Sequence, residues 1–231
     1  MKNFTTLVKE GFEIYKQKIV SILPLMLIFW GLIMILGILI SFIAPGGIIE
    51  NSGYLAVLLI LGIYLLMIFL STFIGFSLVL LVIKPVRTKL KEIFQEVWKK
   101  LWQYFLVTIL VGFFVIITSF LLIIPGIIVG VYLTFSSFVF IIEAEKGINA
   151  LKRSWALVRG NWWKVFGRII LLNIIIGVIY TILISINDSL GSVFQCLSIP
   201  FSMIFMYLIY LELKESKEIQ ASTPIEIQKQ V

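Results

Sequence analysis

The longest uncharged stretch of this chain, residues 101–142, is too long for a single membrane crossing. As one α-helix its 42 residues would extend about 63 Å, against about 30 Å for the hydrocarbon core of a bilayer. Pro125 and Gly126 lie near the middle of the stretch, and both residue types favour a turn. The stretch therefore predicts a hairpin of two crossings, with Pro125 in the first turn of the second crossing.

Each of the other long uncharged stretches has room for one crossing of about 20 residues. These stretches are residues 19–49, 51–83, 169–187 and 189–211. Hydrophobic residues make up 61% of the chain and charged residues only 13%, against about 25% charged residues in typical globular proteins. We therefore expect an all-α, polytopic membrane protein with six transmembrane helices arranged as three hairpins.

The basic residues indicate which side of the membrane holds the termini. All 19 Lys and Arg residues fall in the N-terminal segment, in residues 84–100 and 143–168, or in the C-terminal tail. The three loops on the opposite side hold only Glu50 and Asp188 as charged residues. Because cytoplasmic loops carry the excess of Lys and Arg, we expect a multi-pass protein of the cell membrane with both termini in the cytoplasm. Nucleic-acid binding is not expected, because the chain has no soluble surface large enough for it.

Each basic segment also carries apolar residues at helical spacing. In residues 143–168 the apolar positions recur at steps of three and four, and the cations lie off that stripe. The apolar positions are Ile148, Leu151, Trp155, Val158, Trp162 and Val165. The same pattern in residues 2–18 and 84–100 predicts three amphipathic helices in the cytoplasmic membrane surface, one before each hairpin.

The recurrence of this pattern predicts an internal repeat within a single membrane domain, residues 1–217. The repeats would cover approximately residues 1–83, 84–142 and 143–213, and the polar residues 218–231 would form a disordered tail. The alternative is that any membrane hairpin with basic flanks has this appearance.

The amphipathic segment 143–168 provides the candidate site, a surface for membrane lipid or for a protein partner. Its cations would face the anionic lipids of the cytoplasmic leaflet, and its tryptophans would lie in the headgroup layer. The residues predicted for this surface are Lys152, Arg153, Trp155, Arg159 and Trp162.

The sequence offers little for catalysis, metal binding or coupled transport. The chain has no histidine and a single cysteine, Cys196, which excludes an internal disulfide and the commonest metal sites. Glu143 and Glu145 are the nearest approach to an acid–base pair, but we expect them in the first turns of the surface helix, paired with Lys146 or another basic residue. The crossing interiors hold no ionisable Asp, Glu, Lys or Arg, which disfavours ion-coupled transport. No catalytic residue, metal or cofactor is therefore predicted.

Polar and small residues inside the crossings have two interpretations. Their side chains usually bond to backbone carbonyls or across helix contacts, and they could instead line a path for an uncharged or amphipathic molecule. The polar residues are Ser71, Thr72, Thr108, Thr118, Ser119, Thr134, Ser136, Ser137, Asn173, Gln195 and Ser202. Gly126 with Gly130, and Ser71 with Gly75, have the spacing of close helix packing, which we expect inside one chain.

The most distinctive run of the sequence is IIPGIIVG followed by FSSFVFIIEAEKGINALKRSWALVRGNWWKVF. It resembles the membrane domain found fused to some glycerophosphoryl diester phosphodiesterases, and the standalone YciC-like integral membrane proteins of unknown function. In that family a Pro-Gly hairpin, an acidic residue closing the next crossing, and an Ala-x-x-x-Ser-Trp helix ending in Arg/Lys-Gly recur. The matching residues are Pro125, Gly126, Glu143, Ala150, Ser154, Trp155, Arg159 and Gly160. The resemblance implies an architecture and no settled activity, because this sequence lacks the phosphodiesterase catalytic domain.

Three functions compete at this point. We expect a non-enzymatic scaffold or accessory component that binds anionic lipid or a protein partner at the cytoplasmic face. The alternative is a permease or a component that translocates lipid or another amphiphile. The third is a membrane-embedded enzyme that acts on lipid headgroups through Glu143 or Glu145. The sequence leaves the partner and the oligomeric state open.

Overall fold

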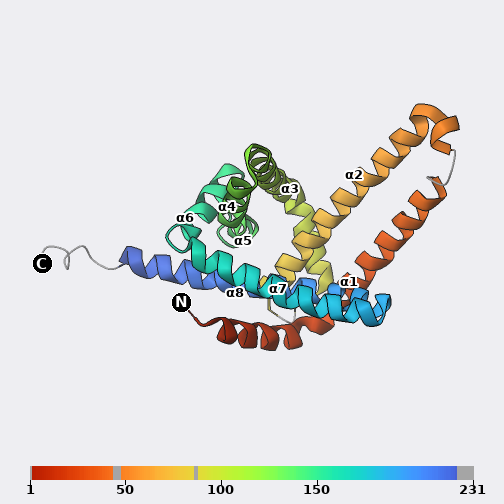
Figure 1. Ribbon diagram of the computed structural model, residues 1–231. Coiled ribbons are helices and arrows are strands. Elements are labelled where there is room, and N and C mark those ends of the chain that lie inside the picture. The colour runs from red at the N-terminus through yellow and green to blue at the C-terminus, as the bar shows by residue number, and fades with distance from the viewer. Residues whose placement is uncertain (1, 44–47, 86–87, 223–231) are drawn as a thin grey trace, which may run out of the picture. The chain divides into compact units, whose positions relative to one another are not determined.

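The computed structural model of the protein describes residues 2–43, 48–85 and 88–222. Within these residues the secondary structure consists of eight α-helices and no strands (Figure 1). The helices are α1 (Phe4–Ile43), α2 (Ile48–Ile83), α3 (Leu90–Leu121), α4 (Ile123–Leu133), α5 (Ser136–Ile142), α6 (Ile148–Val158), α7 (Trp162–Ile186) and α8 (Asp188–Ser222). The polar break predicted between the first two crossings, residues 44–53, is shorter in the structure, because α2 already begins at Ile48, and residues 44–47 lie outside the described residues.

Six segments of the described chain are long and apolar enough to cross a membrane, which confirms the predicted all-α polytopic class. The segments are Phe4–Ser41, Leu58–Ile83, Leu90–Phe120, Ile123–Ile142, Trp162–Ile186 and Asp188–Ile219. The fourth segment combines α4 and α5, which are separated by a turn at Thr134 and Phe135. The predicted hairpin is also confirmed, because α3 ends at Leu121 and Pro125 lies in the first turn of α4.

Two of the predicted surface helices are not separate elements. Each of the helices α1 and α3 is unbroken along its length. The basic segments 2–18 and 84–100 therefore lead directly into membrane crossings. No Gly or Pro occurs in residues 12–23 or 91–111, and the charged residues there are good helix formers. Nothing in the local sequence therefore ends either helix.

The third basic segment does form a helix of its own, α6, which is shorter than predicted. Ala144 and Gly147 have positive φ values of 56° and 52°, so the chain turns between the end of α5 and the start of α6. Gly160 has a φ of 88°, a conformation that favours glycine, and it separates α6 from α7. The prediction that Glu143 and Glu145 occupy the first turns of this helix is wrong, because both precede α6.

The chain divides into two compact units. One unit combines the residues before Lys18 with those after Leu101, and the other spans Lys18–Leu101. α4 to α8 belong to the first unit, in which α7 and α8 form a hairpin and lie side by side (Figure 1). The threefold repeat stays a prediction.

The α7–α8 turn is tight, because α7 ends at Ile186 and α8 begins at Asp188. Asn187 lies between the helices, and its Oδ1 accepts a hydrogen bond of 2.8 Å from the Ser189 N–H, which caps the start of α8. A Cβ at Gly191 would lie 3.0 Å from Ile184 Cβ, so the helices approach closely here. At its other end α8 continues past the predicted limit of residue 217 to Ser222, and the remaining tail lies outside the described residues.

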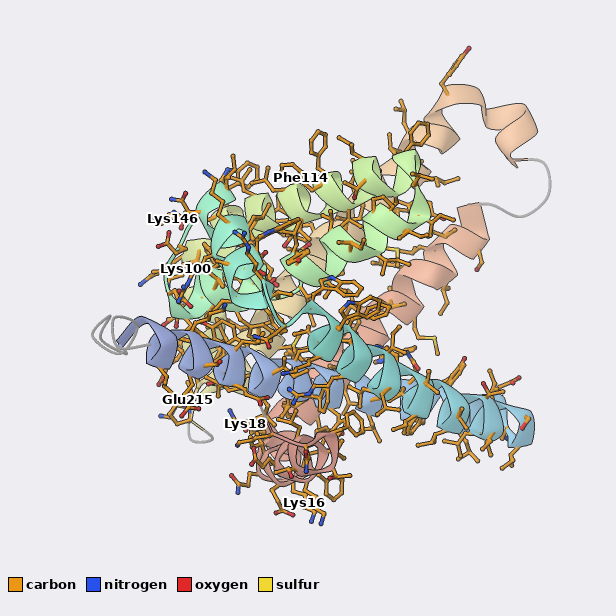
Figure 2. All side chains as sticks on the ribbon, turned by 60° about the vertical axis from the view of Figure 1, so that its left-hand side comes forward. Lys16, Lys18, Lys100, Phe114, Lys146 and Glu215 are labelled. Carbon is orange, nitrogen blue, oxygen red and sulfur yellow. The ribbon has the colours of Figure 1, made fainter. Side chains whose placement is uncertain are left out.

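In the second unit, Lys18 caps the C-terminal end of α2. Its Nζ donates to the carbonyl oxygens of Leu81 at 2.8 Å and Lys84 at 2.6 Å, and also to that of Val82. The last carbonyls of a helix lack partners inside it, and a cation there also complements the helix dipole. Lys18 is therefore buried, whereas Lys16 is exposed (Figure 2).

The α3–α4 hairpin depends on the absence of a side chain at Gly126. A Cβ there would lie 2.0 Å from Ser119 Oγ and 2.8 Å from Ser119 Cα, closer than non-bonded atoms can come. A Cβ added at Gly130 or at Gly75 would meet no atom of a neighbouring element within 4 Å among the described residues. The predicted close packing thus occurs inside the chain at Gly126.

We expect Gly126→Ala to destabilise the protein by about 2 kcal/mol, because the new methyl group must push α3 and α4 apart. Gly130→Ala should be neutral or slightly stabilising, since alanine favours a helix over glycine by up to about 1 kcal/mol. Denaturant unfolding of both variants in one detergent measures the difference. Equal stabilities would contradict the close approach at Gly126.

Candidate functional site

Helix α6 packs against α4, α5 and α8 through a face that includes two small residues. The buried residues of α6 are Ala150, Leu151, Ser154, Leu157 and Val158. Ala150 and Ser154 lie one turn apart, and small residues at this spacing let helices approach closely. The Ser154 hydroxyl donates to the carbonyl oxygen of Tyr132 at 2.7 Å, close to the C-terminal end of α4, where helix carbonyls lack partners. The hydrogen bond from Ser154 therefore attaches α6 to α4.

This buried face differs from the predicted apolar stripe. Of the residues in that stripe, Leu151, Val158 and Val165 are buried, whereas Ile148 is 53% exposed and Trp155 is 39% exposed. Trp155 stacks on Tyr132, with ring centroids 3.9 Å apart and planes inclined by 13°.

Glu143 connects three helices at the end of α5. Its Oε2 lies 2.6 Å from Arg153 Nε on α6, and its Oε1 accepts a hydrogen bond of 2.8 Å from the Tyr210 hydroxyl on α8. The Glu143 side chain is 14% exposed, and Tyr210 is fully buried. Both carboxylate oxygens thus have partners within the protein, and Arg153 of the predicted lipid surface is directed toward this carboxylate.

The connection from α6 to α7 is held by Trp162. Its Nε1 donates to the carbonyl oxygen of Ile128 on α4 at 3.3 Å, and its ring stacks on Phe166 with centroids 4.7 Å apart. Trp163 packs edge-on against Trp162 and is 77% exposed. Trp162 of the predicted surface therefore contributes to packing, and Trp163, which the sequence analysis did not select, presents its indole outward.

Four cations on α6 and its flanks are exposed, and no described carboxylate lies within ion-pair distance of them. They are Lys146, Lys152, Arg159 and Lys164. In the other basic segments Lys84 and Lys100 both pair with Glu96, and Lys16 pairs with Glu13 at 3.2 Å, whereas Lys89, Lys91 and Lys99 are exposed and have no described carboxylate within ion-pair distance. The segment around α6 thus carries four exposed cations that no described carboxylate pairs with.

The two stacked rings, Tyr132 and Trp155, each line a groove. Tyr132 lines the α4–α7 groove, a space of about 790 Å³ that Ile128, Trp162 and Lys164 also line. Trp155 lines the α3–α6 groove of about 370 Å³, together with Lys152. The walls of both grooves are mainly apolar, and each groove contains one lysine.

A family model described as Domain of unknown function (DUF7847) matches residues 52–211, more than half of the chain. The chain belongs to this family. The matched residues include the whole of α4 to α7 and both grooves of this DUF7847 protein. No curated protein matches the chain, and no solved structure does. The resemblance to the phosphodiesterase membrane domain and the YciC-like proteins stays a prediction.

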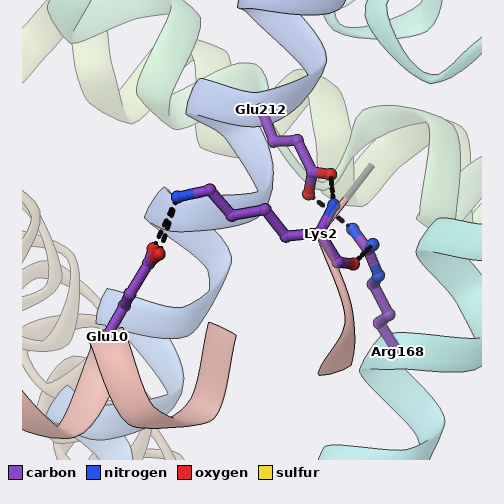
Figure 3. A network of polar contacts seen from close by, with 4 residues as sticks. All are labelled: Lys2, Glu10, Arg168 and Glu212. Atoms are coloured by element: carbon purple, nitrogen blue, oxygen red, sulfur yellow. Dashed lines mark hydrogen bonds and ion pairs between the residues drawn. The ribbon is translucent and has the colours of Figure 1, made fainter. Parts of the chain in front are cut away.

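A second polar cluster in this DUF7847 protein joins the N-terminal segment to α7 and α8 (Figure 3). Arg168 Nη1 lies 2.7 Å from Glu212 Oε2, and Arg168 Nη2 donates to the Lys2 carbonyl oxygen. The main-chain N–H of Lys2 also donates to Glu212, and Lys2 Nζ lies 2.8 Å from both carboxylate oxygens of Glu10. The sequence analysis missed this cluster. The sequence signal for the cluster was a basic residue, Arg168, at the start of the fifth crossing and an acidic residue, Glu212, just after the sixth.

Most of the polar side chains inside the crossings donate to a carbonyl three or four residues earlier. Thr72 Oγ1 donates to Ile68 at 2.8 Å, and Thr108 Oγ1 donates to Tyr104 at 3.1 Å. The same pattern holds for Ser71, Thr118, Thr134, Ser136, Asn173 and Ser202. Across the described chain, no cluster of three His, Cys, Asp or Glu side chains is arranged to hold a metal ion.

Proposed function

We propose that this DUF7847 protein is a non-enzymatic membrane scaffold that binds anionic lipid at the cytoplasmic face of the cell membrane through α6 and its connection to α7. The observation that carries the proposal is a group of four exposed cations on and beside α6. No described carboxylate lies within ion-pair distance of these residues, which are Lys146, Lys152, Arg159 and Lys164. Each Lys or Arg near an anionic leaflet contributes about 1 kcal/mol of attraction.

Two further features support an interfacial position for α6. Trp155 and Trp163 are exposed beside the cations, and indole rings favour the headgroup layer of a membrane. The buried face of α6 is attached to α4, α5 and α8, so lipid held at α6 is coupled directly to the helices of the membrane domain. The cytoplasmic assignment rests on the distribution of the 19 Lys and Arg residues along the chain.

We prefer a scaffold to the other two functions for structural reasons. A permease path needs polar groups that face a passage, whereas most of the polar side chains in the crossings donate to carbonyls of neighbouring turns. An enzyme that uses Glu143 needs a carboxylate oxygen that can reach a substrate, whereas both oxygens of Glu143 bind Arg153 and Tyr210.

Neutralising three cations of this surface tests the proposal. The full-length variant Lys146→Gln, Lys152→Gln, Arg159→Gln is reconstituted in vesicles of equal parts phosphatidylcholine and phosphatidylglycerol. Electron spin resonance with spin-labelled lipids then measures which lipid is immobilised at the protein. We expect the wild type to prefer phosphatidylglycerol, and we expect the variant to lose at least about fivefold of that preference.

A variant with the same loss of charge serves as the control. Lys16→Gln, Lys100→Gln, Lys214→Gln removes three lysines that each pair with a glutamate in their own helix. Its preference for phosphatidylglycerol should fall less than that of the α6 variant. An equal fall in both variants, or a wild type without preference, would contradict the proposal.

A further inference from the structure

The α4–α7 groove has an aliphatic wall. Ile124, Ile127 and Ile128 of α4 line it, and the first two are 71% and 46% exposed. Its volume of about 790 Å³ lies in the range of about 300–1,000 Å³ that is usual for small-molecule sites. A hydrocarbon chain placed in the groove would cover this exposed aliphatic surface.

The opposite wall is aromatic and already fixed in position. Trp162 is held by its hydrogen bond to the carbonyl oxygen of Ile128 and by stacking on Phe166. The planes of the Trp162 and Phe166 rings are inclined by 18°. Trp163 lies edge-on against Trp162 at a centroid distance of 4.7 Å. Because these rings are ordered by contacts inside the protein, a ligand does not have to immobilise them, which lowers the cost of binding.

The charge at the edge of the groove is positive. Lys164 lines the groove and is exposed, and the described residues that line it include no Asp or Glu. A free phosphate ion would leave the isoleucine wall uncovered, and a zwitterionic lipid would bring no net negative charge to Lys164. A molecule with an acyl chain and one net negative charge at its phosphate complements both sides of the groove.

We infer that the α4–α7 groove binds one anionic phospholipid, with the phosphate at Lys164 and an acyl chain along Ile124 and Ile127. The inference rests on the proposed function and goes beyond it, because general attraction of anionic lipid to α6 requires no lipid at a defined place. The bound lipid would cover part of α4 beside the α6–α7 connection.

Native mass spectrometry of the full-length protein, gently extracted from vesicles of equal parts phosphatidylcholine and phosphatidylglycerol, tests the inference. We expect the wild type to retain at least one phosphatidylglycerol per chain, in excess over phosphatidylcholine. Lys164→Gln should lower the retained phosphatidylglycerol about fivefold, as expected for one cation near the phosphate. Ile127→Trp should lower it as well, because the indole fills the groove.

Matched controls separate the groove from general effects. Lys16→Gln removes the same charge outside this groove and outside the α6 surface, and Ile174→Trp adds the same ring at an exposed position on α7. Both controls should retain phosphatidylglycerol as the wild type does, and unchanged helix content by circular dichroism verifies that all variants fold.

Two results would overturn the assignment of a lipid to this groove. One is wild-type retention in both Lys164→Gln and Ile127→Trp, and the other is equal retention of the two lipids by the wild type. If either occurs while the spin-label experiment still gives a preference that depends on the α6 cations, only the groove assignment fails. If that preference is absent too, the proposed function fails with it.

Discussion

Arg168→Met should destabilise the protein by about 3–5 kcal/mol, the usual cost of breaking a buried ion pair from one side. Arg168 and Glu212 are only 11% and 10% exposed, so the carboxylate left behind has little access to water. The substitution also removes the donor to the Lys2 carbonyl oxygen, which fixes the N-terminal segment beside α7 and α8 (Figure 3). Denaturant unfolding in detergent measures the loss.

Arg159→Met is the matched control for this prediction. Arg159 is exposed, and the described residues provide no carboxylate for it, so its removal should change stability by less than about 0.5 kcal/mol. The double variant Arg168→Met, Glu212→Leu should recover part of the loss, because the buried carboxylate then no longer lacks its guanidinium partner. If Arg168→Met and Arg159→Met unfold at the same denaturant concentration, the Arg168–Glu212 pair does not stabilise the fold.

The membrane crossings could be predicted from the sequence because each requires a run of about 20 apolar residues. The hairpin at Pro125 and Gly126 was predictable for the same reason, since an uncharged stretch of 42 residues must fold back. Helix continuity was not predictable in this way. A surface helix that is followed by a separate crossing has the same apolar periodicity as one long helix. In α1 and α3 no Gly or Pro separates the two parts.

The basic amphipathic helix that carries the candidate site could be predicted from the sequence, but its contacts inside the protein could not. Its buried face includes the small residues Ala150 and Ser154, and Trp155 stacks on Tyr132. The partners of Glu143 were only partly predictable. Arg153 lies within the same basic segment, but Tyr210 is 67 residues away, and a single sequence carries no signal for a contact at that separation.

Glu143→Leu should destabilise the protein by about 3 kcal/mol. The substitution takes the acceptor from the Tyr210 hydroxyl, which is fully buried, and the counter-charge from Arg153. Arg153 is 35% exposed and can reach water, so the cost falls at the lower end of the range for buried pairs. Tyr210→Phe, which removes only the hydroxyl, should cost about 1 kcal/mol.

Glu145→Leu distinguishes a structural role of Glu143 from a catalytic one. The described residues place no cation within ion-pair distance of Glu145, so this variant should unfold almost as the wild type does. A double-mutant cycle of Glu143→Leu with Arg153→Leu should give a coupling energy of about 1 kcal/mol or more, because the two side chains are in direct contact. If Glu143→Leu costs no more than Glu145→Leu, the carboxylate does not hold α5, α6 and α8 together. Loss of a hydrolytic activity at unchanged stability would then favour an enzyme, because it would leave chemistry as the only role for Glu143.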